Sequence, residues 1–322
     1  MGVNKIYQGD ALSVLQTFPD NTIDMCMTSP PYWGLRDYGV EQVFPDGSKG
    51  QLGLEPTPEQ YIQHMTEIFH EVKRVLKKIG TLWVVIGDTY GGSCQGGGDT
   101  GLSKKRYRKE LLTYRDKPQK KMIPKCLMMI PERLAWSMIQ DGWILRNKNI
   151  WYKHNNMPES VKDRFSNKYE FVYMFSQSKK YYFDLDAVRE KHKEAAVERY
   201  KRKWNGNGNR DYPNGPQNHM KNFMNNEEAK ARALEAGKNP GDVFEINTQP
   251  FPKAHFAVYP VKLCEKPIRA GCKKGGIVLD LFSGAGTTCY AAAKLGRDFI
   301  GIEISEKYKA MSENRIFGSL FK

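Results

Sequence analysis

Residues 275–305 read GGIVLDLFSGAGTTCYAAAKLGRDFIGIEIS, and this stretch decides the fold of the chain. A buried strand is expected up to Asp280, a glycine-rich turn and an alanine-rich helix follow, and a second apolar strand ends at Glu303. This order of elements is a βαβ unit. Strands and helices alternate in the same way through most of the chain, which predicts an α/β fold with a mainly parallel sheet.

The glycine-rich turn of this unit is typical of a ligand site. Gly284 and Gly286 would let a ligand approach the backbone closely, at the start of a helix whose N–H groups point toward it. The turn lacks both the G-x-G-x-x-G pattern and the Gly-Lys-Thr of a P-loop, which disfavours hydride transfer and nucleotide hydrolysis. Glu303 can accept hydrogen bonds from the two hydroxyls of a ribose. A tight turn and a solvated acid would explain each feature alone, but together they favour an adenosine-containing cofactor.

A second motif lies near the N-terminus, where residues 28–33 read TSPPYW. The preceding residues 23–28 read as a buried strand, and the two prolines remove two backbone donors and fix two φ angles. Residues 80–88 predict another buried strand, which ends at Asp88. Residues 57–80 between them predict an amphipathic helix that begins at Thr57 and Pro58 and is stopped by Gly80.

The composition favours a polyanionic partner. The 322 residues carry a formal charge of +14, from 50 Lys and Arg against 36 Asp and Glu. Gly101–Lys125 contains ten basic and two acidic residues with two tyrosines between them, and Arg199–Arg210 forms a second basic cluster. A solvated basic surface is the plain alternative, but basic residues beside aromatics suit phosphate contact with base stacking.

Other classes of protein are disfavoured by what the sequence lacks. No run of 18 apolar residues suggests a membrane span, and the first residues contain no signal peptide. The six cysteines form no C-x-x-C pair, so the sequence contains no pattern of two cysteines and two histidines for zinc. We expect no metal, and reduced thiols in a cytosolic protein.

The motifs together resemble those of the amino-directed DNA methyltransferases of the permuted β class. These are N4-cytosine and N6-adenine enzymes, often of restriction–modification systems or phage. The resemblance rests on TSPPYW, LDLFSGAGTT and GIEIS, and covers all but residues 186–240. HFAVYP (255–260) resembles the motif that precedes the cofactor loop, and residues 151–176 resemble a late motif of the catalytic region.

The resemblance implies a Rossmann-like, S-adenosylmethionine-dependent methyltransferase fold with circularly permuted motif order. Residues 1–185 would form the catalytic half, 186–245 a loop-rich target-recognition insert and 246–322 the cofactor-binding half. A solvated linker is the plain alternative for the insert. The expected partners are double-stranded DNA and a cognate restriction endonuclease, without metal or membrane, in the cytoplasm of a bacterial, archaeal or phage-infected cell.

The catalytic residues are expected in the proline motif. A conjugated exocyclic amine is a poor nucleophile, and two acceptors directed at its N–H bonds would favour attack on a methyl group. Ser29 Oγ and the carbonyl of Pro30 would be these acceptors, with Pro31 stiffening the turn and Tyr32 offering a flat face to a flipped base. Asp88 is expected to take the amine proton, directly or through Ser29; a turn or cap aspartate is the alternative.

Two larger sets of residues complete the predicted site. Asp10 is either a helix cap or a partner of the cofactor's adenine. The cofactor-binding set is Asp10, His255, Phe256, Pro260, Asp280, Phe282, Ser283, Gly284, Gly286, Thr287, Thr288 and Glu303. The nucleic-acid-binding set is Lys104, Lys105, Arg106, Arg108, Arg199, Arg202 and Arg210.

The choice of base rests on the serine of the proline motif. Family members that read SPPY mostly act on cytosine N4, and those that read DPPY mostly on adenine N6. We therefore expect transfer to cytosine N4, with adenine N6 as the alternative. An RNA- or protein-directed methyltransferase, or a non-enzymatic nucleic-acid binder, is less well supported, because the cofactor loop reads as intact.

Overall fold

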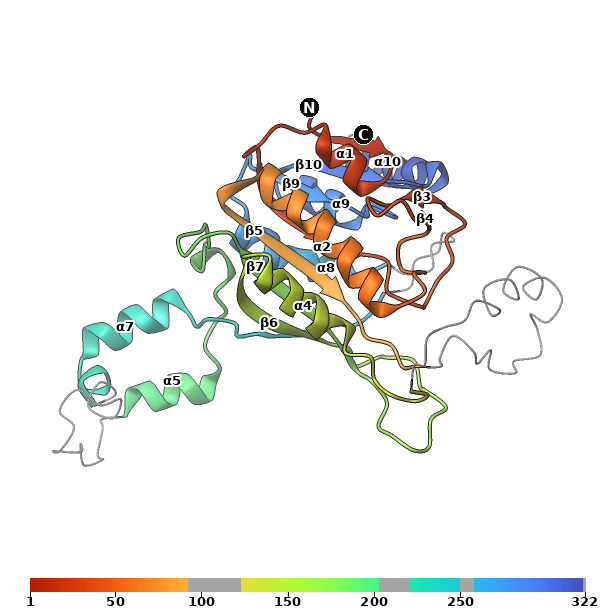
Figure 1. Cartoon of the computed structure of the whole chain (residues 1–322). Coiled ribbons are helices and arrows are strands. Elements are labelled where there is room, and N and C mark those ends of the chain that lie inside the picture. Colours follow the sequence, from red (N-terminus) through yellow and green to blue (C-terminus); the bar gives the residue numbers. More distant parts are fainter. Residues whose placement is uncertain (92–122, 203–220, 250–257, 321–322) are drawn as a thin grey trace. The chain divides into compact units, whose positions relative to one another are not determined.

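An eight-stranded, mostly parallel sheet forms the frame of the chain (Figure 1). The computed structural model describes residues 1–91, 123–202, 221–249 and 258–320. β7 runs antiparallel to both of its neighbours, and the other adjacent pairs are parallel. In sheet order the strands are β1 (Lys5–Gln8), β10 (Asp298–Glu303), β9 (Ile277–Asp280), β2 (Ile23–Thr28), β5 (Leu76–Ile86), β7 (Tyr169–Ser176), β6 (Ile144–Tyr152) and β8 (Val243–Glu245).

The pairing confirms the permuted order of motifs. β1 pairs with β10, with Gln8 opposite Glu303, so an early strand of the chain lies beside a late one. β2 pairs with β9, with Cys26 opposite Leu279. The proline motif and the glycine turn therefore leave the sheet from neighbouring parallel strands, at the same edge.

Helices cover both faces of this sheet. α1 (Ala11–Gln16), α2 (Pro58–Val75) and α4 (Ile130–Gln140) pack on one face (Figure 1). α8 (Val261–Gly271), α9 (Thr287–Lys294) and α10 (Glu306–Leu320) pack on the other. Each layer buries its own apolar core against the strands, and a two-stranded hairpin, β3 (Gln42–Val43) with β4 (Lys49–Gly50), precedes α2.

The predicted end of α2 is wrong, although its start is confirmed. The Thr57 side chain accepts from the N–H of Gln60 at 3.2 Å, and Pro58 occupies the first turn. The helix ends at Val75, and Gly80 lies inside β5. A Cβ on Gly80 would lie 2.8 Å from the Asp24 carbonyl, so this glycine serves close packing of β5 and does not stop the helix.

Residues Asp184–Gly241 form a second compact unit. It contains a 3-10 turn at Asp186–Val188 and the helices α5 (Glu194–Lys201) and α7 (Glu227–Ala236). Glu190 and Lys238 exchange two backbone hydrogen bonds, at 3.0 and 2.8 Å, which close the unit at its base. The predicted insert, residues 186–245, overlaps this unit. The last residues of the predicted insert form β8, which pairs with β6 of the main sheet.

Two searches of the described residues bear on membrane and metal binding. None of the helices found there is both long and apolar enough to cross a bilayer. The same residues contain no group of three or more histidine, cysteine or acidic side chains arranged to hold a metal ion.

Candidate active site

One buried carboxylate joins the two predicted motifs. Thr28, the last residue of β2, donates its hydroxyl to Asp280 Oδ1 at 2.7 Å, across 252 residues of sequence. The N–H of Phe282 donates to the same oxygen at 3.2 Å. Asp280 is fully buried, and burial raises the pKa of its carboxyl group. The segment that begins at Ser29 and the glycine turn are therefore held to one anchor at the carboxyl edge of the sheet.

These two segments face a common cavity of about 900 Å³. The predicted catalytic residues Ser29, Pro30, Pro31, Tyr32 and Asp88 all line it. The residues of the predicted cofactor set that line it are Asp10, Phe282, Ser283, Gly284, Thr287 and Glu303.

Four other residues of the cofactor set lie outside the cavity lining. Asp280 anchors both motifs, and Thr288 Oγ1 hydrogen-bonds the hydroxyl of Tyr259, a residue that lines the cavity. A Cβ on Gly286 would lie 2.3 Å from Ser312 Oγ of α10, so this glycine permits helix packing. Pro260 is buried at the start of α8. Their direct contact with the cofactor stays a prediction. His255 and Phe256 lie outside the described residues.

Glu303 stabilises the glycine turn. Its two carboxylate oxygens accept from the N–H groups of Gly284, at 2.7 Å, and Ser305, at 2.9 Å. Burial raises the pKa of Glu303, and these hydrogen bonds act in the opposite direction. Each carboxylate oxygen keeps a second lone pair, so the predicted contact with ribose hydroxyls stays chemically open. Asp10 caps α1 by accepting from the N–H of Ser13 at 2.9 Å, while it also lines the cavity.

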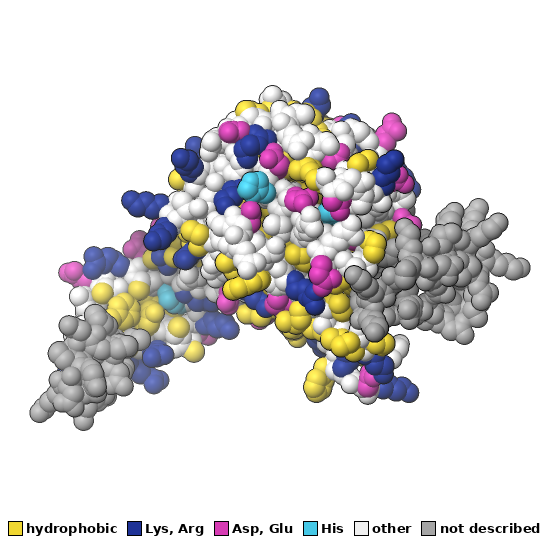
Figure 2. All heavy atoms as spheres, viewed as in Figure 1, with side chains coloured by type: hydrophobic (Ala, Val, Ile, Leu, Met, Phe, Trp, Pro, Cys, Tyr) yellow, Lys and Arg dark blue, Asp and Glu magenta, His cyan; other side chains and the backbone are white. Residues whose placement is uncertain are grey.

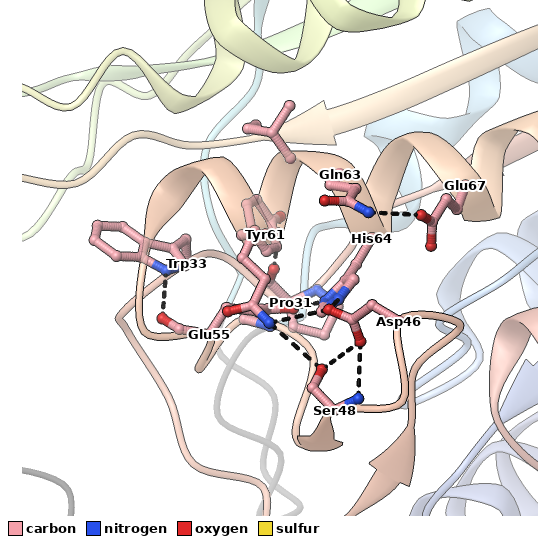
Figure 3. Close-up of polar contacts among 12 residues, drawn as sticks. Pro31, Trp33, Asp46, Ser48, Glu55, Tyr61, Gln63, His64 and Glu67 are labelled. Atoms are coloured by element: carbon pink, nitrogen blue, oxygen red, sulfur yellow. Dashed lines mark hydrogen bonds and ion pairs between the residues drawn. The ribbon is translucent and has the colours of Figure 1, made fainter. Parts of the chain in front are cut away.

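A polar frame holds the proline motif from outside the cavity (Figure 3). The Tyr61 hydroxyl donates to the Pro31 carbonyl at 2.9 Å. The indole N–H of Trp33 donates to the Glu55 carbonyl at 3.0 Å, and Trp33 is buried, as expected of a packing residue. Within the described part of the chain, no donor reaches the Pro30 carbonyl. Its predicted role as an acceptor for the target amine stays a prediction.

His64 contacts two acidic residues of this polar frame (Figure 3). Its Nδ1 lies 3.1 Å from Glu55 Oε1 and its Nε2 lies 3.2 Å from Asp46 Oδ2. The imidazole also stacks on Phe44, with 3.9 Å between the ring centroids. Burial acts to lower the pKa of His64, but the hydrogen bonds to the two carboxylates outweigh it, and the pKa is raised. The cluster links the β3–β4 hairpin to α2, beneath the proline motif.

Comparison with known proteins decides the family. A family model described as DNA methylase, of the N6/N4 type, matches residues 23–314. The chain belongs to the N6/N4 DNA methylase family.

Relatives and solved structures agree with this assignment. The chain is 36% identical to the Type II methyltransferase M.Cfr9I of Citrobacter freundii, over 97% of this chain and 87% of that protein. It is 35% identical to the Type II methyltransferase M.SmaI of Serratia marcescens, over 97% and 90%. The PvuII DNA methyltransferase (cytosine-N4-specific) shares the fold, with a TM-score of 0.62, 19% identity and coverage of 98% and 90%. The M1.HpyAVI–SAM complex gives a TM-score of 0.51, 16% identity and coverage of 97% and 98%.

The cavity of this N6/N4 methylase fits its family's cofactor, S-adenosylmethionine. The glycine turn brings backbone close to the cavity, with Gly284 at a φ of +51° that suits glycine. Glu303 offers carboxylate oxygens for hydroxyl groups, and Phe282 offers an apolar ring. When bound there, the cofactor supplies an electrophilic methyl group on its sulfonium. Residues Phe282–Gly284, Thr287 and Glu303 would hold it.

Asp88 is a helix cap in this methylase. Its Oδ1 accepts from the N–H groups of Thr89, at 2.8 Å, and Ile130, at 3.0 Å, and its Oδ2 from that of Met129, at 3.0 Å. Burial raises the pKa of the Asp88 carboxyl, and the three backbone bonds oppose that rise. The cap alternative is therefore observed, and a role in proton transfer stays a prediction.

Lys153 and Glu170, which no sequence motif singles out, line the same cavity. The Tyr32 hydroxyl donates to Glu170 Oε2 at 2.7 Å, and Lys153 forms an ion pair with Glu170 Oε1. Both residues lie in the stretch 151–176 that resembles a late catalytic-region motif. That resemblance indicates that the stretch belongs to the catalytic region, but it does not identify which side chains take part.

Only two of the residues predicted to contact DNA lie within the described structure. Arg199 and Arg202 are exposed, in the unit Asp184–Gly241. The face of the molecule in Figure 2 intersperses basic and acidic side chains, without a continuous basic stripe among the described residues. Lys104, Lys105, Arg106, Arg108 and Arg210 lie outside the described residues, so their predicted role stays a prediction.

Proposed function

We propose that the chain transfers a methyl group from S-adenosylmethionine to the exocyclic N4 amine of a cytosine flipped out of duplex DNA, at a specific sequence. The observation that carries the proposal is the shared cavity: Ser29, Pro30 and the glycine turn all line it, and Asp280 accepts hydrogen bonds from Thr28 and Phe282, one in each motif. This arrangement supports direct transfer to an amine.

The residues on the cavity wall have distinct tasks in this reaction. Ser29 Oγ and the Pro30 carbonyl accept the two N–H bonds of the amine, which favours a pyramidal nitrogen and stabilises the charge that develops on it. The Tyr32 ring stacks on the base. Such stacking returns about 1–3 kcal/mol of the few kcal/mol that flipping costs.

The preference for cytosine rests on Ser29 in the SPPY motif. Adenine presents a similar edge, an amine beside a ring nitrogen, and the family includes enzymes for both bases. Transfer to adenine N6 is therefore the alternative product.

We further propose that the insert 186–245 reads the target sequence, with Arg199, Arg202 and Arg210 at the DNA. The basic residues Lys104–Arg108 would track phosphate. Because the relatives are Type II methyltransferases, a cognate restriction endonuclease and a cytoplasmic location in a bacterial, archaeal or phage-infected cell are part of the same proposal.

Nucleoside analysis tests the proposal directly. The chain and its Ser29→Ala variant are expressed in a host without methylases of its own, and the host DNA is digested to nucleosides. N4-methylcytosine with the parent, and its loss with Ser29→Ala, is the expected result. N6-methyladenine would establish the alternative, and unmodified DNA with cofactor-binding protein would refute methylation of DNA bases.

A further inference from the structure

A chain of polar contacts crosses the cavity wall from the proline motif to the β6–β7 hairpin. Ser29 lies three residues before Tyr32 and lines the same cavity. Its side chain acts to lower the pKa of Tyr32, against the larger effect of burial, which raises that pKa. The Tyr32 hydroxyl donates to Glu170 Oε2 at 2.7 Å, and the other oxygen of Glu170 pairs with Lys153. All four residues line the cavity. Figure 1 shows β5, β7 and β6 side by side in the sheet.

The wall is shaped to hold Tyr32 against Glu170. A Cβ on Gly87, just after β5, would lie 2.7 Å from Cε2 of Tyr32 and 3.4 Å from Cγ of Glu170. The bare backbone of Gly87 therefore lets the tyrosine ring lie close against the end of β5, with its hydroxyl at the carboxylate of β7. On the far side, Lys153 Nζ lies 4.1 Å from the centroid of the Trp151 ring, which fixes the ammonium beside Glu170.

Glu170 is better placed than Asp88 to accept a proton from a group in the cavity. The two oxygens of Asp88 already accept three backbone N–H groups at the start of α4. The oxygens of Glu170 instead face a tyrosine hydroxyl and an ammonium, both of which are groups of the cavity wall. The Glu170 side chain is 22% exposed, so it can exchange a proton with water.

We propose that Glu170 receives the proton lost by the target amine, through the hydroxyls of Ser29 and Tyr32, and that it positions the Tyr32 ring for the base. Methyl transfer forms the N–CH₃ bond, breaks the S–CH₃ bond and leaves the nitrogen positively charged. The nitrogen gives a proton to Ser29 Oγ as Ser29 gives its own to Tyr32 and Tyr32 gives its own to Glu170. Both hydroxyls end neutral, and Glu170 returns the proton to water. Lys153 keeps the carboxylate in place by pairing with its other oxygen.

The test separates proton acceptance from positioning by single-turnover transfer of labelled methyl to DNA. Glu170→Gln keeps an acceptor for the Tyr32 hydroxyl but cannot take a proton. Tyr32→Phe keeps the ring and breaks the relay one step nearer the base. Tyr181→Phe is the matched control, because it removes a tyrosine hydroxyl that accepts from Arg146 Nε at 2.9 Å outside the cavity lining.

We expect Glu170→Gln and Tyr32→Phe each to lower the single-turnover rate about 100-fold, the scale of general-base contributions. The dissociation constants for cofactor and DNA should stay within about twofold of the parent. The double variant should fall no further, because both changes cut one path. Tyr181→Phe should keep the parent rate.

Three results would overturn the relay. The first is a single-turnover rate of Glu170→Gln within about threefold of the parent rate. The second is a double variant whose loss of rate equals the product of the two single losses, and the third is a variant that loses cofactor affinity as much as it loses rate. Should Glu170→Gln fail to fold, Tyr32→Phe alone decides, since it leaves the Glu170–Lys153 pair intact. The inference rests on methylation of an exocyclic amine and not on which base carries it. Total label transferred tests the relay, whereas nucleoside identity tests the proposed function.

Discussion

Thr28→Val should weaken both halves of the site at once. The substitution keeps the shape of a buried strand residue but removes the hydroxyl that donates to Asp280 Oδ1 at 2.7 Å. Losing a hydrogen bond to a buried carboxyl group costs about 1–3 kcal/mol, because the acceptor is left short of a partner. Asp280 keeps the N–H of Phe282 at 3.2 Å and the Tyr259 hydroxyl at 3.4 Å, so the loss is partial.

The effect of Thr28→Val on stability and on cofactor affinity can be worked out from the contacts of Asp280. A loss of about 2 kcal/mol should lower the midpoint of thermal unfolding by about 4–8 °C in a domain of this size class. If half of that free energy reaches the glycine turn, cofactor affinity falls about fivefold. Urea unfolding gives the free energy of unfolding, and calorimetry with S-adenosylmethionine gives the dissociation constant.

Thr17→Val is the matched control. Thr17 is an exposed threonine whose hydroxyl donates to the Val14 carbonyl at 2.7 Å at the end of α1. Its loss should cost less than about 0.5 kcal/mol, as exposed substitutions usually do. If Thr28→Val is as stable as Thr17→Val and binds cofactor as tightly as the parent, the shared carboxylate does not join the two motifs energetically.

Three further changes test the surroundings of the site. Gly87→Ala places a Cβ 2.7 Å from Tyr32 Cε2, so the single-turnover rate should fall about tenfold or more with cofactor affinity kept; an unchanged rate would contradict the placement of Tyr32. The pKa of His64 is raised above its ordinary value of 6.5, so its stabilisation is complete below that pH and is lost as pH rises through the raised pKa. Melting from about pH 6 to about pH 9 should show the parent losing more stability than His64→Gln, and parallel curves would refute the cluster's role. Asp88→Asn should cost about 1 kcal/mol in urea unfolding, because one oxygen facing the N–H groups of α4 becomes an amide; equal stability would show that the cap is not needed.

Much of the site was predictable because it depends on local pattern. Short stretches of sequence determine where strands end and turns begin. The positions of TSPPYW and the glycine turn, each directly after a strand, could therefore be predicted correctly. The pairing of β1 with β10 agrees with the permuted motif order that the sequence predicts.

The remainder depends on contacts that no local pattern encodes. Glu170 meets Tyr32 only because β7 lies beside β5, and Lys153 joins it only because β6 turns back on β7. Gly80 reads as a helix stop, yet the nearby Asp24 carbonyl explains it. Asp280 lies at the end of a strand like a ligand-binding acid, but Thr28 and Phe282 both donate to its Oδ1, and it is not part of the cavity lining.

The most direct measurement is a crystal structure with a non-reactive cofactor analogue and a duplex that contains the target sequence. We predict one base rotated out of the helix, with its exocyclic nitrogen within about 3.2 Å of both Ser29 Oγ and the Pro30 carbonyl, on the side that faces the analogue. A base that stays stacked in the duplex, or an analogue bound away from Gly284, would contradict it.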